Sequence, residues 1–368
     1  MKHSRYVSYL AVCIGALTGG SCQKASQIPR ANVYEVWNQP NAPERLEWNF
    51  SRSFDELPLK GELDVAPWMD TYWPTAKGGI NNRWAGTGQG FDLLSPNLET
   101  LQQMTEEQLR GLSPAEKYDA FVGRYDYPTV KLERGRTRPD AKSWEGLCHG
   151  WAPASLAFKE PGVVTLQGAN GIRIPFGSSD IKALLIFLQG EAANPRPVNR
   201  MLGLRCGLRS GTFTDVSSAS ACKDVNAGAF HIVLTNYLGI RRHGFVVDRV
   251  RANEVWNHPV WKYKSRVISE TEPSPQAAEG TVREVVLETD MTFAIETDAA
   301  WEPWSPRGVR ADKTATYRYQ VELNINDEII GGEWISGDRP DFLWIAEGTD
   351  FSGYYSQVKS IYEASIGN

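Results

Sequence analysis

The sequence predicts an α+β protein in which a cysteine-bearing helix packs on an antiparallel sheet and a β-rich C-terminal region follows. Helix caps and amphipathic segments are concentrated between residues 95 and 190. From Phe230 onward, runs of β-branched and aromatic residues alternate with polar ones, which is typical of strands with one buried face. This order of helical and strand signals favours one large α+β body with an appended sheet.

Helices are predicted on the N-terminal side of the cysteine. Residues 95–96 and 105–106 look like helix starts, because a hydroxyl residue precedes a residue suited to the first turn. Ser113 and Glu116 have the spacing of a capping box, and they lead into the amphipathic residues 118–122. We therefore expect a helix at each of these starts.

The segment 144–156 predicts a turn that delivers a single cysteine, Cys148, to the first turn of a helix. Gly146 and Gly150 permit a tight approach, Pro153 is compatible with a first helical turn, and good helix formers follow. Unpaired N–H groups and the positive end of the helix macrodipole stabilise a thiolate at such a position. We interpret Cys148 as a nucleophile in preference to a buried cysteine packed as a small hydrophobe.

One core helix and several strands are predicted after the cysteine. Residues 171–176 have the pattern of a short strand, and a helix capped at residues 179–180 carries apolar residues at core-face spacing. Residues 230–236 and 244–250 predict an antiparallel hairpin. Further strands are expected at residues 283–287, 317–325 and 329–332, with a loop at residues 270–280.

The first residues predict export. Lys2 and Arg5 precede an apolar stretch and then small residues, so we interpret residues 1–22 as a signal peptide. The last five of these residues also resemble a lipoprotein cleavage box in which Cys22 would carry the lipid. The expected location is outside the cytoplasm, as a secreted, periplasmic or outer-membrane-anchored protein.

The remaining chain is expected to hold a tether and one large domain. Residues 23–56 are polar and turn-rich, which favours a tether, and residues 57–368 are assigned to the catalytic domain, with its β-rich part at about 281–345. No later stretch approaches the 18 or so continuous apolar residues of a spanning helix, so membrane attachment is expected only through an N-terminal lipid. The formal net charge is −5, and the acidic chain without a basic block is a poor candidate for nucleic-acid binding.

Three cysteines remain once the signal is removed. Cys206 and Cys222 flank a polar segment rich in Gly, Ser and Thr, and a disulfide that closes about 15 residues would contribute about 3 kcal/mol. Cys148 is then the free thiol. Zinc is disfavoured because the sequence has no C-x-x-C and no His pair at i, i+4. No metal or other cofactor is predicted, and calcium at an irregular site stays an open alternative because no EF-hand spacing occurs.

A cysteine nucleophile needs a base. His149 adjoins Cys148, and neighbouring side chains on a helix diverge by roughly 100°, so we expect it not to accept the thiol proton. His231 is predicted on a strand, and Asp248 ends the adjacent strand, where it could orient the imidazole. Papain-like peptidases and transglutaminases use this order of Cys, His and Asp. Asn257 is the alternative orienter.

Several motifs resemble one known family. The string Cys-His-Gly-Trp-Ala-Pro-Ala at residues 148–154, the helix of residues 180–185 and the segment 228–231 resemble the transglutaminase elicitor family of oomycetes and its bacterial relatives. The likeness runs from about residue 60 to 345. Residues 255–260 are similar to the surface segment that plants recognise in oomycete members. Similar motifs also occur at residues 67–68, 72–75, 112–119, 330–334 and 340–344.

The resemblance implies a papain-like core and acyl transfer by Cys148. The thiolate would attack the γ-carboxamide of a glutamine in a protein or peptide, and an amine acceptor or water would resolve the thioester. His231 and Asp248 are the partners in this placement. The oxyanion would bind the backbone N–H of Cys148, with the indole of Trp144 or Trp151 as a second donor or as part of a dry channel.

Two other functions compete with this one. A papain-like cysteine peptidase or amidase of the cell envelope would share every catalytic residue and differ only in its pocket and acceptor. A non-catalytic, tryptophan-rich binding protein, for example one for carbohydrate, would instead present Trp68, Trp73, Trp301 and Trp304 as stacking faces.

Overall fold

The computed structural model describes residues 41–86, 90–92, 95–192, 198–204, 224–305, 308 and 310–367. The predicted signal peptide, Cys22 and the predicted Cys206–Cys222 disulfide lie outside these residues. No helix in the described ranges is long and apolar enough to cross a membrane.

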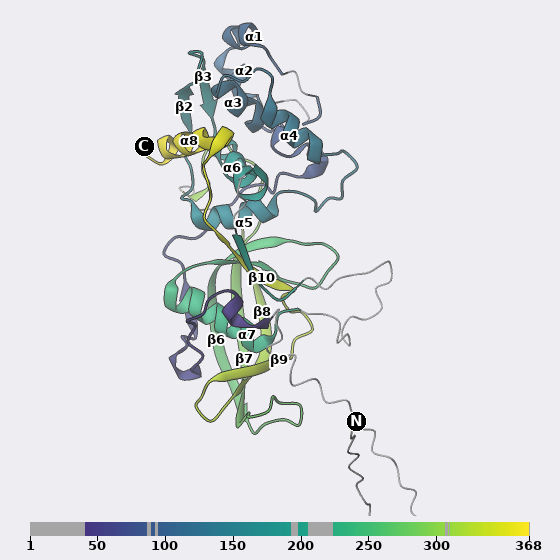
Figure 1. Cartoon of the computed structure of the whole chain (residues 1–368), viewed down its shortest axis with the longest axis vertical. Helices are drawn as coiled ribbons and strands as arrows, with labels where there is room; N and C mark the ends of the chain where they lie inside the picture. Colours follow the sequence, from purple (N-terminus) through teal and green to yellow (C-terminus); the bar gives the residue numbers. More distant parts are fainter. Residues whose placement is uncertain are drawn as a thin grey trace, which may run out of the picture.

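The helices gather mainly at one end of the molecule. They are α1 (Leu98–Gln103), α2 (Glu106–Arg110), α3 (Pro114–Phe121), α4 (Pro128–Arg136), α5 (Cys148–Ala157), α6 (Ser178–Phe187), α7 (Ala227–Leu234) and α8 (Gln357–Ile366). Short 3-10 or π-helical turns are η3 (Pro43–Arg45), η4 (Phe54–Glu56), η5 (Thr75–Lys77), η6 (Gly79–Asn81), η7 (Leu188–Ala192), η9 (Thr235–Arg241) and η11 (Gly353–Ser356). Figure 1 shows α1 to α4, α6 and α8 at one end, the large sheet with α7 at the other, and α5 between them.

The predicted starts of α2 and α3 are confirmed, whereas α6, expected to be capped at residues 179–180, starts at Ser178 after the N-cap Gly177. Ser113 and Glu116 form the expected capping box at the start of α3, and Thr105 with Gln108 forms another at α2. Helix α1 starts after Asn97, whose side chain accepts the N–H of Thr100, slightly later than expected. Local side-chain to backbone hydrogen bonds thus place these helix starts, as the sequence pattern predicts.

The described strands form one large antiparallel sheet and a separate hairpin. They are β1 (Lys60–Glu62), β2 (Val164–Gln167), β3 (Arg173–Phe176), β4 (Val198–Leu202), β5 (Phe245–Asp248), β6 (Asn257–Thr271), β7 (Arg283–Ala294), β8 (Asp312–Leu323), β9 (Ile329–Trp334) and β10 (Phe342–Glu347). The sheet order is β4-β10-β5-β6-β7-β8-β9, with β1 also paired to β6, and β2 pairs with β3. The predicted C-terminal strands therefore continue the sheet of β5 and β6 and do not form an appendage.

Residues 230–236, predicted as a strand, form α7 and the start of η9 instead. The side chain of Asn226 caps the helix by accepting the N–H groups of Gly228 and Ala229. Every residue of α7 is buried, so no polar face distinguishes the segment, and a fully apolar run is compatible with either a buried strand or a buried helix. The expected hairpin is consequently a helix followed by the strand β5.

The two faces of the sheet pack against different helices. In the register, Asp248 lies opposite both Phe342 and Asn257, so these three side chains point to one face. Val246 is on the same face and clusters with Ala152 of α5. The alternate residues of β5 point to the other face, where they share a core with α7. Helices α5 and α7 thus lie on opposite faces of β5.

Part of the predicted tether belongs to the folded domain. Leu46 is fully buried in the core that contains α7. The backbone N–H of Ser51 donates to the Asn236 side chain at 2.9 Å. Phe54 stacks on His231 with ring centroids 5.9 Å apart. Residues 41–56 therefore cover one side of the sheet core.

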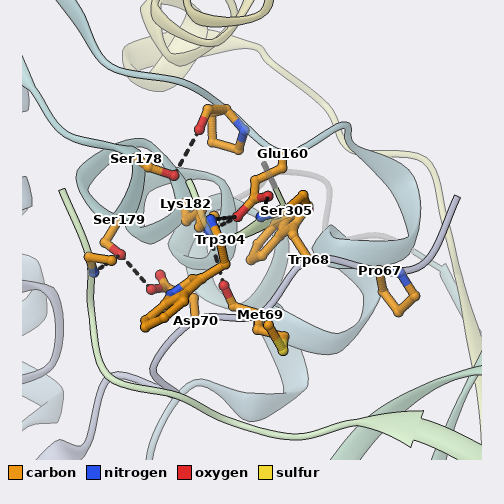
Figure 2. Close-up of polar contacts among 12 residues, drawn as sticks. Pro67, Trp68, Met69, Asp70, Glu160, Ser178, Ser179, Lys182, Trp304 and Ser305 are labelled. Carbon is orange, nitrogen blue, oxygen red and sulfur yellow. Dashed lines mark hydrogen bonds and ion pairs between the residues drawn. The ribbon is translucent and has the colours of Figure 1, made fainter. Parts of the chain in front are cut away.

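A buried ion pair fastens α6 to three loops (Figure 2). The Nζ of Lys182 binds Glu160 Oε1 at 2.6 Å and donates to the carbonyl oxygen of Met69 at 2.9 Å. The Glu160 carboxylate also accepts the backbone N–H groups of Trp304 and Ser305, each at 2.8 Å. The cluster thus joins four segments of the chain, and removing one charged partner would leave the other buried and uncompensated.

Candidate active site

Cys148 is the first residue of α5, as the sequence predicts. Leu147 before it has non-helical backbone angles (φ −103°, ψ 27°), and its N–H donates to the carbonyl of Tyr72 at 2.6 Å. The thiol therefore lies at the end of the helix where N–H groups lack intrahelical acceptors. Pro153 falls in the second turn of the helix, beyond the first turn expected for it.

Two glycines let α5 approach the end of α6. A Cβ on Gly150 would lie 2.2 Å from the carbonyl oxygen of Ile186, a distance that no side chain tolerates. A Cβ on Gly190, in η7, would lie 3.0 Å from His149 Nε2. The lack of side chains at both positions leaves the room in which His149 reaches η7.

His149 links the thiol to a carboxylate. Its Nε2 lies 3.0 Å from Oε1 of Glu191, and the adjacent Cys148 side chain interacts electrostatically with its ring. Burial lowers the pKa of His149, but the hydrogen bonds and charges of these two partners outweigh it and raise the pKa to about 9. An imidazolium beside the sulfur is therefore the stable form at neutral pH. His149, which was not expected to accept the thiol proton, thus extends to Glu191 in η7 and has a raised pKa.

Glu191 is a site residue that sequence reasoning missed. It lies in η7, a π-helical turn that continues α6. No spacing motif connects it with Cys148, and a charged residue after a core helix is usually a solvated end. The sequence carries no signal for it, and the π-helical turn, a feature often found at functional sites, is visible only in the structure.

Asn257 contacts the sulfur of Cys148. Its Nδ2 is 3.4 Å from the sulfur, and its Oδ1 accepts the indole N–H of Trp344 at 2.8 Å. Cys148, Asn257 and Trp344 are each only 5% exposed. Asn257, predicted as an alternative orienter of the histidine, thus contacts the sulfur itself.

The structure does not bring His231 to Cys148. His231 lies in α7, on the opposite face of the sheet, and its Nδ1 shares a 2.8 Å hydrogen bond with the Tyr319 hydroxyl. Its other ring nitrogen is buried and has no hydrogen-bond partner among the described residues. Burial lowers the pKa of His231 to about 3, so the ring is neutral and packed in the core.

Asp248 ends β5 and lies directly opposite Asn257 in the register. It is buried and points to the same face of the sheet as Asn257. Of the predicted catalytic group, Cys148 and Asp248 therefore share one face, while His231 is on the other.

Trp144 and Trp151, predicted as a second oxyanion donor or as part of a dry channel, lie in different environments. Trp151 is fully buried in the helical core, and its indole N–H has no hydrogen-bond partner. Trp144 is half-buried in the turn before α5. Neither has a hydrogen bond to the Cys148 side chain in the described part of the chain.

Other aromatic residues lie beside the thiol. The carbonyl of Val255 is 3.8 Å from the Cys148 sulfur, and the next residue, Trp256, packs edge-to-face on Tyr72 with centroids 5.2 Å apart. A Cβ on Gly146 would collide with the Tyr72 ring at 2.5 Å, which explains the glycine two residues before the cysteine. Tyr72 and Trp256 thus form the aromatic wall of the site.

A groove of about 610 Å³ follows the C-terminal half of α5. Pro153 and Leu156 line it together with Val246, and Arg200 and Arg242 also contribute. Cys148 is at the other end of the helix, so this groove is separate from the thiol. The described residues contain no group of three or more His, Cys, Asp or Glu side chains placed to hold a metal ion.

Comparisons with known proteins relate the chain to transglutaminases. The crystal structure of the GP42 transglutaminase from Phytophthora sojae is similar at 21% identity and a TM-score of 0.64, over 90% of this chain and 98% of that chain. This likeness establishes a shared fold that mixes helices with an antiparallel sheet. No curated protein matches the chain significantly. The model of the transglutaminase elicitor family matches residues 139–353, which is more than half of the sequence and contains both Cys148 and Asn257. The chain therefore belongs to the transglutaminase elicitor family.

Proposed function

We propose that this protein is an exported acyltransferase that joins the side chain of a glutamine to a primary amine. The observation that carries the proposal is the surroundings of Cys148, where the His149–Glu191 pair adjoins it in the chain and the Asn257 amide lies 3.4 Å from its sulfur. Membership of the transglutaminase elicitor family supports acyl transfer as the reaction class. The signal-like residues 1–22 support export.

In the first half of the reaction, the Cys148 thiolate attacks the γ-carboxamide carbon of a glutamine in a protein or peptide. A C–S bond forms and the carbonyl electron pair moves to oxygen. When this pair returns, the C–N bond breaks and the His149 imidazolium gives its proton to the departing ammonia. The products of this half are a thioester and a neutral imidazole held by Glu191.

In the second half, a primary amine attacks the thioester carbon. His149 accepts the proton of the amine, a C–N bond forms and the C–S bond breaks. The thiolate and the imidazolium are restored, so the cycle needs no further reagent. Water in place of the amine would convert the glutamine to glutamate.

We assign the proton transfer to His149 because it lies against both Cys148 and Glu191, whereas His231 is packed on the other face of the sheet. The Nε2 of His149 is held by Glu191, which leaves Nδ1 for the thiol. Asp248 lies beside Asn257 on the neighbouring strand, where it supports the same face of the site.

Different observations separate the transferase from a binding protein and from a cysteine peptidase or amidase. A binding protein with stacking tryptophans is disfavoured because Trp68 and Trp73 are 2% and 1% exposed and offer no free ring face. A cysteine peptidase or amidase would use the same thiol and histidine, so only the products separate it from a transferase.

The test is incubation of the full chain with cadaverine and a protein that contains both glutamine and lysine, followed by mass spectrometry. A gain of cadaverine with loss of ammonia, absent in Cys148→Ala, is the expected result. Deamidation alone, a gain of about one mass unit, would show that water is the acceptor. Backbone fragments would assign the protein to the peptidases, and an unmodified substrate would contradict acyl transfer.

A further inference from the structure

The side-chain amide of Asn257 has only one chemically sensible orientation. The indole nitrogen of Trp344 can donate but not accept a hydrogen bond, so the atom it meets at 2.8 Å must be the amide oxygen. The NH₂ group of Asn257 consequently faces the sulfur of Cys148, 3.4 Å away. Trp344 on β10 thus fixes the orientation of the Asn257 amide on β6.

This donor lies where negative charge develops during acyl transfer. The substrate carbon bonds to the sulfur, so its oxygen must come close to groups that surround the sulfur. Donors stabilise such an oxyanion when they lie about 2.7–3.1 Å from its position. The NH₂ group has two N–H bonds, so one can face the sulfur while the other meets the substrate oxygen.

The surroundings make such a hydrogen bond effective. Asn257, Trp344 and Cys148 are all buried, and an electrostatic interaction is stronger in a region of low dielectric constant than in water. Strand pairing of β5, β6 and β10 holds the amide before substrate arrives. The first turn of α5 offers backbone N–H groups on the helix side of the sulfur.

We infer that Asn257 is a catalytic residue that donates a hydrogen bond to the oxyanion of the acyl-transfer intermediate, and that Trp344 is the positioning residue that orients it. This inference rests on the proposed function. It differs from the orienter role expected for Asn257, because the imidazole of His149 is already held by Glu191.

The test compares two reactions of the same thiol. Acylation by p-nitrophenyl acetate passes through an oxyanion, whereas alkylation by iodoacetamide displaces iodide without one. Asn257→Ala is expected to slow acylation by roughly 10²–10³-fold and to slow alkylation, which loses only the hydrogen bond to the sulfur, by a much smaller factor. Trp344→Phe keeps a ring but removes the N–H, so it should slow acylation by a smaller factor and spare alkylation.

Controls separate this role from a structural one. Asn253→Ala makes the same substitution at an exposed position of the same segment and should change neither rate. Cys148→Ala gives the background of both reactions, and circular dichroism of each variant checks folding. An equal fall of acylation and alkylation in Asn257→Ala, or no fall in either, would overturn the inference. A wild-type thiol that is alkylated but never acylated would refute the proposed function itself.

Discussion

The carboxylate of Glu191 lies 3.0 Å from Nε2 of His149 and so determines which ring nitrogen is left for Cys148. A histidine next to a nucleophile in sequence normally points to a different side of the helix. Here the ring has space because Gly190 carries no side chain, and Glu191 holds it in place. In the proposed mechanism this pair takes the role expected of His231 and Asp248, from a different part of the chain.

His149→Ala should reduce the rate of acyl transfer by roughly 10²–10⁴-fold, the usual contribution of a general acid–base residue. His231→Gln keeps a hydrogen-bonding group in the core and should leave the activity of the folded fraction near that of the wild type. The measurement is cadaverine incorporation per folded molecule, with the folded fraction taken from circular dichroism. An active His149→Ala beside a folded, inactive His231→Gln would restore the triad expected from the sequence.

Glu191→Gln should change the pH profile of the reaction. The Glu191 carboxylate is one of the groups that raise the pKa of His149 to about 9, so its removal lowers that pKa. The imidazolium is lost as pH rises through this value, and the alkaline limb of kcat/KM should therefore move to lower pH. Rates measured across the range, together with NMR titration of labelled histidine, would test this. An alkaline limb that stays near pH 9 in the variant would disconnect Glu191 from the reaction.

The fold could be predicted where local chemistry decides it. The capping box of Ser113 and Glu116 and the strand alternation around Tyr317 and Tyr319 are local patterns, and both elements are present. Residues 230–236 could not be distinguished in this way, because a helix buried on every side has no polar positions that reveal its period.

The candidate site was predictable only in part for a related reason. The position of Cys148 at a helix start is predictable from the glycines around it, because these constrain the backbone locally. Glu191 reaches the site only because α6 packs on α5, and Trp344 only because β10 lies next to β5. Neither contact leaves a pattern in a single sequence, so the roles of Glu191 and Trp344 can be identified only from the tertiary structure.

Gly150→Ala should be strongly destabilising, because its Cβ would lie 2.2 Å from the backbone oxygen of Ile186 and the two helices would have to separate. Overpacking of this kind typically costs about 1–3 kcal/mol and occasionally more. Gly135→Ala is the matched control: it lies in α4, and a Cβ there meets nothing within 4 Å. The control should be stabilised by about 0.5–1 kcal/mol, as expected for alanine in a helix. Urea denaturation would measure both, and equal stability of the two variants would contradict the close packing.

Asp70→Asn should remove a pH dependence of stability that originates in the cluster of Figure 2. Burial raises the pKa of Asp70 from 3.8 to about 7, although the charge of Lys182 and a 2.6 Å hydrogen bond from the Ser179 hydroxyl act against this. One oxygen of the carboxyl group, Oδ2, is buried and finds no hydrogen-bond partner in the part of the chain that the structure describes, which suits a protonated acid.

The direction of the effect follows from the protons bound in each state. Between pH 4 and 7 the folded protein keeps a proton on Asp70 that the unfolded chain releases, so the free energy of unfolding falls as pH rises through this interval. The fall contributed by this residue is at most about 1.4 kcal/mol for each pH unit. Asparagine cannot ionise, so the variant should gain stability relative to the wild type as pH rises from 4 to 7, and the difference should level off above that. Urea denaturation of both proteins at several pH values gives this difference directly, and parallel pH profiles would show that Asp70 is ionised in the folded protein.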